Sequence, residues 1–223
     1  MSEKLMTRLS LLCSLTGIAA LYVGAMQMRP TLTPLAKINE DYVGLSVMVS
    51  GQVIDLHEHR DGHLFLKLRD ESGGVISVPI FTSVRSELNE PIELLDNVQV
   101  TGQVKLYNGD LEVIPEKGAD LHIVHTPPIG LANIGRDRLG ELIKTQGVIA
   151  RRDIVGNGSL ILTLRDDDTE LPVFVPASVA NEERFPELHV GYTMRASGWL
   201  QLYNERLELK IGDPAHLEVI EAS

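Results

Sequence analysis

The chain has 223 residues, of which 43% are hydrophobic and 4% are aromatic. This hydrophobic content excludes a disordered chain, and the length is sufficient for two domains of ordinary size. The formal net charge of -11 repels polyanions over the whole molecule, so a nucleic-acid-binding function would require a local basic patch. Cys13 is the single cysteine, so the rest of the chain can form no disulfide and no thiolate metal site.

An uncharged stretch of 20 residues lies between Arg8 and Arg29. At ~1.5 Å per residue, a helix of this length can cross the hydrocarbon core of a bilayer. Residues 1–29 are therefore predicted to form a single-pass transmembrane anchor. Small residues at positions 23–25 leave a cleaved signal peptide as the alternative interpretation.

The charges that flank this stretch give a weak indication of topology. Lys4 and Arg8 precede it, whereas Arg29 and Lys37 follow it. The amino terminus adds a further positive charge on the first side, which slightly favours placing the rest of the chain outside the membrane. Residues 30–34, with two prolines, cannot continue a helix and are predicted to form a short, stiff linker.

The chain contains an internal repeat, which appears when the sequence is shifted against itself by 96 positions. The shift aligns residues 62–70 with residues 158–166. Further identical pairs at this offset are Gly51 and Gly147, Gly102 and Gly198, and Tyr107 and Tyr203. One constant offset over such a span indicates a duplicated domain. The predicted domains are 35–125 and 131–223, joined by a linker of residues 126–130.

Each copy has the pattern of a small β domain. Alternating and β-branched runs predict strands at 47–54, 64–68, 75–81, 98–106 and 111–114, and at 143–149, 160–164, 171–175, 193–202 and 207–210. The dipeptides Asp61-Gly62 and Asn157-Gly158 favour hairpin turns between the first two strands of each copy. Residues 82–93 and 177–188 lack alternation and predict a short helix or an irregular crossover. The fold class is therefore all-β, with two tandem five-stranded Greek-key barrels.

Several of these segments resemble a known family. Residues 49–53, 62–70 and 102–104 resemble the OB-fold nucleic-acid-binding domains of the anticodon-binding and helicase type. The resemblance implies that single-stranded nucleic acid lies across strands two and three of each barrel and between the strand-connecting loops. The residues implied by position are Phe65, Lys67 and Arg69 in the first copy, and Thr163 and Arg165 in the second. The second copy has Ile161 and Thr163 where the first has Phe65 and Lys67, so the first copy is the main predicted site.

The acidic charge of both domains limits the affinity of this site for nucleic acid. Residues 40–125 contain 6 basic and 15 acidic residues, and residues 136–223 contain 10 basic and 15 acidic residues. Backbone phosphates supply most of the affinity for single strands, and stacking of bases on aromatic rings adds to it. Tyr107 and Tyr203, which precede the last hairpin turns, could stack bases or pack over the barrel end. The predicted nucleic-acid-binding residues are Phe65, Lys67, Arg69, Arg60, Tyr107, Arg151, Arg165 and Tyr203.

Other side chains suggest chemistry, but each has an ordinary structural interpretation. His57, His59, His63 and His122 invite a metal hypothesis, yet the second copy has no equivalents, which favours surface histidines. The acidic runs 70–71 and 166–168 lack the spacing of a calcium loop and are typical of turns. Trp199 is interpreted as a core or interface residue.

Two functional hypotheses from different classes follow. No catalytic nucleophile motif or phosphate-binding glycine loop is present, so we expect a binding protein with no cofactor and not an enzyme. The first hypothesis is a membrane-anchored tandem OB-fold protein that binds single-stranded nucleic acid weakly through the first domain. The alternative is a protein-interaction or cell-envelope module without a nucleic-acid role, which the acidic charge and the outward topology favour.

Overall fold

The computed structural model describes residues 3–27 and 30–221. Helix α1 (Glu3–Gln27) belongs to one compact unit, and a second unit begins at Leu32. Within the described residues, no helix is both long enough and apolar enough to cross a membrane. Residues 1–2 and 28–29 of the predicted anchor lie outside the described part of the chain. The membrane anchor therefore stays a prediction from the sequence.

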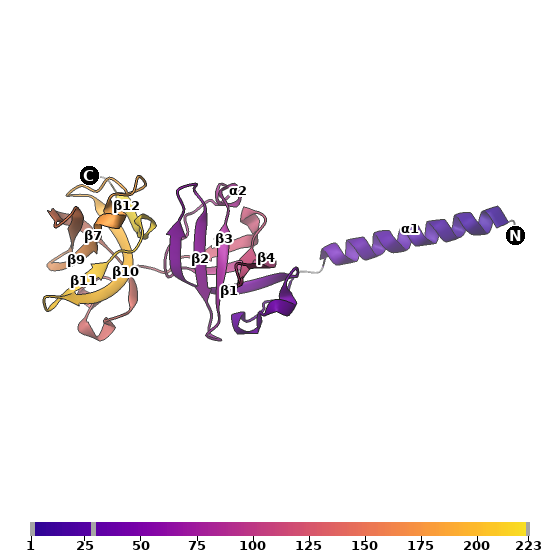
Figure 1. Ribbon diagram of the computed structural model, residues 1–223, viewed down its shortest axis with the longest axis horizontal. Coiled ribbons are helices and arrows are strands. Elements are labelled where there is room, and N and C mark those ends of the chain that lie inside the picture. Colours follow the sequence, from indigo (N-terminus) through magenta and orange to yellow (C-terminus); the bar gives the residue numbers. More distant parts are fainter. Residues whose placement is uncertain (1–2, 28–29, 222–223) are drawn as a thin grey trace. The chain divides into compact units, whose positions relative to one another are not determined.

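The first repeat forms a closed barrel (Figure 1). Its strands are β1 (Ser46–Glu58), β2 (Leu64–Arg69), β3 (Val75–Ile80), β4 (Asn97–Tyr107), β5 (Asp110–Ile114) and β6 (Leu121–Val124). They pair in the order β1-β2-β3-β5-β4-β6, and an additional pairing of β1 with β4 closes the first five into a ring. The sheet therefore has six strands, and the prediction of five omitted β6, which adds to the outer edge of β4.

The second repeat has the same topology. Its strands are β7 (Leu142–Val155), β8 (Ser159–Asp166), β9 (Thr169–Val175), β10 (Thr193–Tyr203), β11 (Arg206–Lys210) and β12 (Leu217–Glu221). Pairing of β10 with β11 closes this barrel, and β12 is again a sixth strand that the sequence analysis omitted. The predicted crossovers contain the single-turn helices α2 (Thr82–Arg85) and α3 (Ala177–Ala180). Short 3-10 helices occupy Leu35–Lys37, Glu40–Tyr42, Gly118–Asp120, Leu131–Asn133, Arg136–Arg138 and Pro214–His216.

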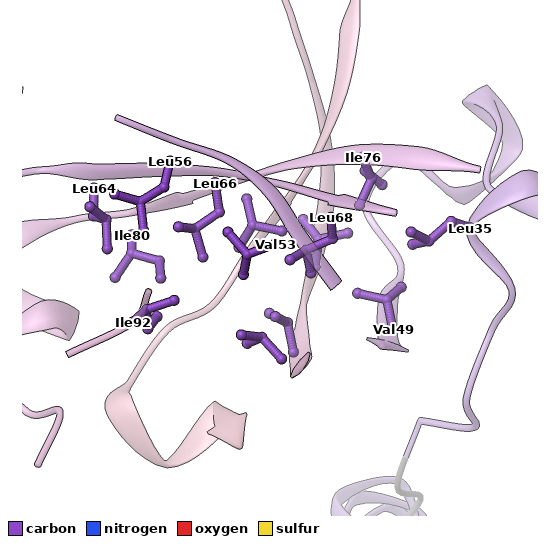
Figure 2. Packing of buried hydrophobic residues seen from close by; sticks show 14 of the residues in the cluster. Leu35, Val49, Val53, Leu56, Leu64, Leu66, Leu68, Ile76, Ile80 and Ile92 are labelled. Carbon is purple, nitrogen blue, oxygen red and sulfur yellow. The ribbon is translucent and has the colours of Figure 1, made fainter. Parts of the chain in front are cut away.

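Strand β2 shows how the sequence pattern creates both a core and a surface. Because successive side chains of a strand point to opposite faces, its three leucines are buried in the barrel, whereas the residues between them are exposed. Figure 2 shows these leucines packed with Val53, Leu56 and Ile80 of the neighbouring strands. Burial of such aliphatic side chains contributes about 1.5–3 kcal/mol each to folding. The same alternation places Phe65, Lys67 and Arg69 together on the outer face.

A glycine allows β1 to change its pairing partner. Strand β1 pairs with β4 up to Gln52 and with β2 from there onward. A Cβ atom on Gly51 would lie 2.8 Å from the carbonyl oxygen of Arg69, which is closer than Cβ contacts allow, and Gly147 has the equivalent contact in the second barrel. A bulge follows at residues 53–55, where the pairing register of β1 with β2 shifts.

Buried charges connect the two barrels. The ammonium group of Lys144 on β7 lies 2.7 Å from Asp96 Oδ1 and 2.7 Å from Glu93 Oε2, both in the segment that precedes β4. Lys144 exposes 1% of its surface and Asp96 exposes none. Arg195 on β10 lies 2.6 Å from the other oxygen of Glu93 and 2.9 Å from Glu218. Lys144 therefore finds its acidic partners across the contact between the barrels, whereas Arg195 also pairs with Glu218 of its own barrel.

Polar and apolar contacts extend this inter-barrel interface. His216, in the 3-10 helix Pro214–His216, contacts the carbonyl oxygen of Leu56 through its Nε2 atom at 2.8 Å. His57 Nδ1 lies 2.5 Å from Asp213 Oδ2. Leu142 and Ala215 of the second repeat pack against the core of the first barrel. The two barrels consequently belong to one compact unit.

His125 pairs with two carboxylates of the first repeat, and this pairing predicts a pH-dependent contribution to stability. Burial by itself would lower the pKa of His125, but hydrogen bonding and attraction to Asp96, with a further contact to Glu90, raise it above the ordinary value. A histidine whose pKa is higher in the folded protein than in the unfolded chain stabilises the folded protein. The full contribution is present at pH values below the unfolded-state pKa, and it disappears as the pH rises through the folded-state pKa. Because the side chain is 39% exposed, we expect a contribution of about 1 kcal/mol or less.

We therefore expect the stability difference between the wild type and His125→Gln to be larger at pH 5.5 than at pH 8.5. Urea unfolding of both full chains, followed by tryptophan fluorescence, measures this difference at each pH. Comparison with the wild type is necessary because burial lowers the pKa of His216, which changes stability in the opposite direction. An equal difference at both pH values would contradict the role assigned to His125.

Candidate nucleic-acid interface

The outer face of the first barrel carries the predicted row of Phe65, Lys67 and Arg69 along β2. In register, Phe65 lies between His57 of β1 and Pro79 of β3. The three side chains alternate with buried leucines, so they point to the same side and are spaced roughly 7 Å apart. Phe65 is 39% exposed, so one face of the row presents an aromatic ring to solvent.

Other rings extend the surface around Phe65. The ring of His59 lies edge-on to Phe65 with centroids 6.5 Å apart, and it stacks on His63 at 6.3 Å. His63 in turn contacts Phe81 edge-on at 5.4 Å. These four side chains come from β2, the loop that precedes it, and the end of β3. Sequence reasoning interpreted the two histidines as surface residues but missed Phe81, whose position depends on the pairing of β2 with β3.

The basic side chains of this face differ in their availability. Lys67 Nζ lies 3.5 Å from Asp55 Oδ2, and both side chains are more than half exposed, so this pair contributes little. The Arg69 side chain forms no ion pair within the described residues. Arg60 is largely exposed, with its Nε atom 4.0 Å from Asp61 Oδ1. Arg69 and Arg60 are therefore the cations most accessible to a polyanion.

A groove continues the face beyond Arg69. The groove has a volume of about 740 Å³ and is lined by Arg69, Gln52, Asp70 and Glu71 among others. The equivalent positions of the second barrel, around Arg165, line a smaller groove of about 290 Å³. The first barrel thus combines the larger groove with an arginine that has no ion pair among the residues the structure describes.

The predicted basic residues of the second barrel are held in ion pairs. Arg165 donates two hydrogen bonds to Glu170 Oε1, at 2.9 and 2.5 Å. Arg151 Nε lies 2.7 Å from Asp153 Oδ2. Thr163, the counterpart of Lys67, is buried, and its hydroxyl has no hydrogen-bond partner within the described residues. The second copy therefore presents few available groups on the face equivalent to the β2 row.

The structure places the two predicted tyrosines away from the β2 row. Tyr107 ends β4 and Tyr203 ends β10, each directly before a tight hairpin turn. Both side chains are more than half exposed. They lie on strands that close the barrels, so they do not join Phe65 in one surface row.

The histidine and carboxylate groups behave as structural residues. Within the described residues, no group of three or more histidine, cysteine or acidic side chains could hold a metal ion. Asp70 accepts hydrogen bonds from the Leu35 amide and from Ser72. Burial acts to raise the pKa of Asp70, but these hydrogen bonds outweigh it and lower the pKa below its usual value. This geometry agrees with the turn interpretation of residues 70–71.

Comparison with known families identifies the first barrel. A family model described as an OB-fold nucleic acid binding domain, of the tRNA anticodon type, matches residues 47–121. The matched segment contains β1 to β5, which are the strands that close the ring. Together with the repeated topology, this match defines a mostly β protein with two OB-like domains, as the resemblance predicted.

Solved structures share only limited similarity with the chain. Asparaginyl-tRNA synthetase from Pyrococcus horikoshii is 19% identical over 44% of this chain and 24% of its own, with a TM-score of 0.38. The tetrameric p202 HIN2 structure is 13% identical over 78% and 92%, with a TM-score of 0.44. The Ifi202 HINa domain, solved with 20-bp double-stranded DNA, is 12% identical over 78% and 97%, with a TM-score of 0.41. The chain spans about a quarter of the synthetase, and no curated protein matches it.

Proposed function

We propose that this chain binds single-stranded nucleic acid through the first barrel, on the face formed by the β2 row of Phe65, Lys67 and Arg69. The observation that carries the proposal is that the matched family segment, residues 47–121, contains an exposed ring and, on the same face of β2, an arginine without an ion pair in the described part of the chain. Bases would stack on Phe65, and phosphates would contact Arg69, Lys67 and Arg60.

The charge of the first barrel predicts weak and salt-sensitive binding. Residues 40–125 contain 6 basic and 15 acidic residues, so attraction comes from the local row and not from the whole domain. Three phosphate contacts would give a slope of roughly -2 in a plot of log affinity against log salt concentration. Between 50 and 200 mM salt, this slope corresponds to a loss of affinity of about 20-fold.

A fluorescence anisotropy titration of the full chain with a labelled 15-nucleotide thymidine strand tests the proposal. We expect saturable binding that weakens by about 20-fold between 50 and 200 mM salt. The same sequence as a duplex serves as the control and should bind more weakly, because its bases cannot stack on Phe65. If neither DNA nor RNA single strands bind at low salt, the nucleic-acid proposal is wrong.

A further inference from the structure

The outer face of β10 and β11 in the second barrel carries an unusual set of side chains. Trp199 lies opposite Lys210, and Tyr203 lies opposite Arg206, in the antiparallel register of the two strands. Side chains in directly opposed positions have Cβ atoms about 4.5–5.5 Å apart. Each aromatic ring is therefore adjacent to a basic side chain. We call these four residues the β10–β11 strip.

The rings of the strip are accessible. Trp199 is 54% exposed, so its interpretation as a core residue is wrong, and Tyr203 is similarly exposed. A large apolar ring on the surface is informative, because tryptophan is ordinarily well buried. The parallel pairing of β11 with β9 also places half-buried Phe174 beside Lys210. Lys210 consequently lies between two aromatic side chains on neighbouring strands.

The cations of the strip are also available. Within the described residues, neither Lys210 nor Arg206 forms an ion pair. Glu208 lies on β11 between the two cations, but it is 5% exposed and accepts a hydrogen bond from Gln201 at 2.9 Å, so it is largely withdrawn from the surface. The carboxylate of Glu205 in the hairpin turn pairs with Arg136. Positive charge therefore remains beside the two exposed rings.

The first barrel lacks this arrangement at the equivalent positions. There, Gln103 lies opposite Ile114, and Tyr107 lies opposite Asp110. Burial and the neighbouring Asp110 raise the pKa of Glu112, which shows that acidic groups crowd this face. The strip is thus a property of the second copy alone, and the shared fold does not require it.

We propose that the β10–β11 strip is a second binding site for single-stranded nucleic acid, separate from the β2 row. Bases stack on Trp199 and Tyr203, and phosphates contact Lys210 and Arg206, which is the combination that sequence-tolerant single-strand binding uses. The two rings are four residues apart on β10, or about 13 Å, so they contact bases that are not adjacent. The inference takes its class of ligand, single-stranded nucleic acid, from the proposed function. The site itself consists of different residues.

Trp199 is the single tryptophan of the chain, so its emission reports on the strip alone. We would titrate the full chain with an unlabelled 15-nucleotide thymidine strand and follow tryptophan emission, with the anisotropy assay in parallel. We expect saturable quenching in the wild type and in the double variant Phe65→Ala/Arg69→Ala. Lys210→Ala should reduce the salt slope of the quenching titration by about 1, and Lys210→Arg should restore it. Lys105→Ala on β4 of the first barrel is the matched control and should leave quenching unchanged.

The outcomes separate the two sites. Binding by anisotropy without any change in tryptophan emission overturns the strip and leaves the first-barrel proposal intact. Quenching that disappears in the double variant also overturns the strip as a separate site. If both signals are absent from the wild type, the proposed function fails together with the strip. Quenching that persists in the double variant but loses salt sensitivity in Lys210→Ala supports the strip.

Discussion

Replacing Lys144 with methionine is expected to lower the free energy of unfolding by about 3–5 kcal/mol, because breaking a buried ion pair by removing one partner is strongly destabilising. Lys144 is 1% exposed and lies 2.7 Å from both Asp96 and Glu93. Asp96 is fully buried, so its carboxylate cannot recover hydration when the ammonium group is removed. Methionine is a suitable replacement, since the equivalent position of the first copy is Met48.

Urea unfolding of the full chain, followed by the emission of Trp199, measures this effect. The double variant Lys144→Met/Asp96→Asn should lose less stability than the sum of the single variants, because the two side chains interact directly. Lys210→Ala, an exposed lysine of the same barrel, should remain within about 0.5 kcal/mol of the wild type. A Lys144→Met protein as stable as the wild type would show that the inter-barrel charges do not hold the barrels together.

Replacing Phe65 with alanine is expected to weaken the binding of single-stranded nucleic acid, and this is the second large effect. Base stacking on an aromatic side chain contributes ~1–3 kcal/mol per base, so affinity for a single strand should fall by roughly 5- to 150-fold. Arg69→Ala should instead reduce the salt slope by about 1, because it removes one phosphate contact. Anisotropy titrations of the full-length variants at several salt concentrations distinguish these two effects.

Arg165→Ala provides a matched control for Arg69→Ala, because the two arginines occupy equivalent positions of the repeat. Arg165 is bound to Glu170, whereas Arg69 has no ion pair within the described residues, so we expect Arg165→Ala to have a smaller effect on the salt slope. Unfolding curves of both variants verify that each remains folded. Equal changes for the two arginines would contradict the assignment of the site to the first barrel.

The sequence by itself determined the local architecture. The constant offset of 96 predicted two like domains, and the resemblance to OB-fold domains selected Phe65, Lys67 and Arg69, which lie on one exposed face of β2. The common face of these three residues follows from the period of two along a strand, which is a property of the backbone alone. The omitted strands β6 and β12 have four and five residues and only add to the edge of an existing sheet. The hydrophobic alternation of such short segments is weak, so they are recognised as strands only by their pairing with a neighbouring strand.

Tertiary structure alone decided which charges are buried and which are free. Met48 of the first copy corresponds to Lys144 of the second, and Asp96 corresponds to Tyr192. The sequence did not show that Lys144 and Asp96 form an ion pair between the two barrels. It also did not show that Trp199 would be exposed opposite Lys210. Ion pairing, burial and the accessibility of a ring depend on contacts between residues far apart in the chain. These contacts follow from the packing of closed sheets, which no local sequence pattern encodes.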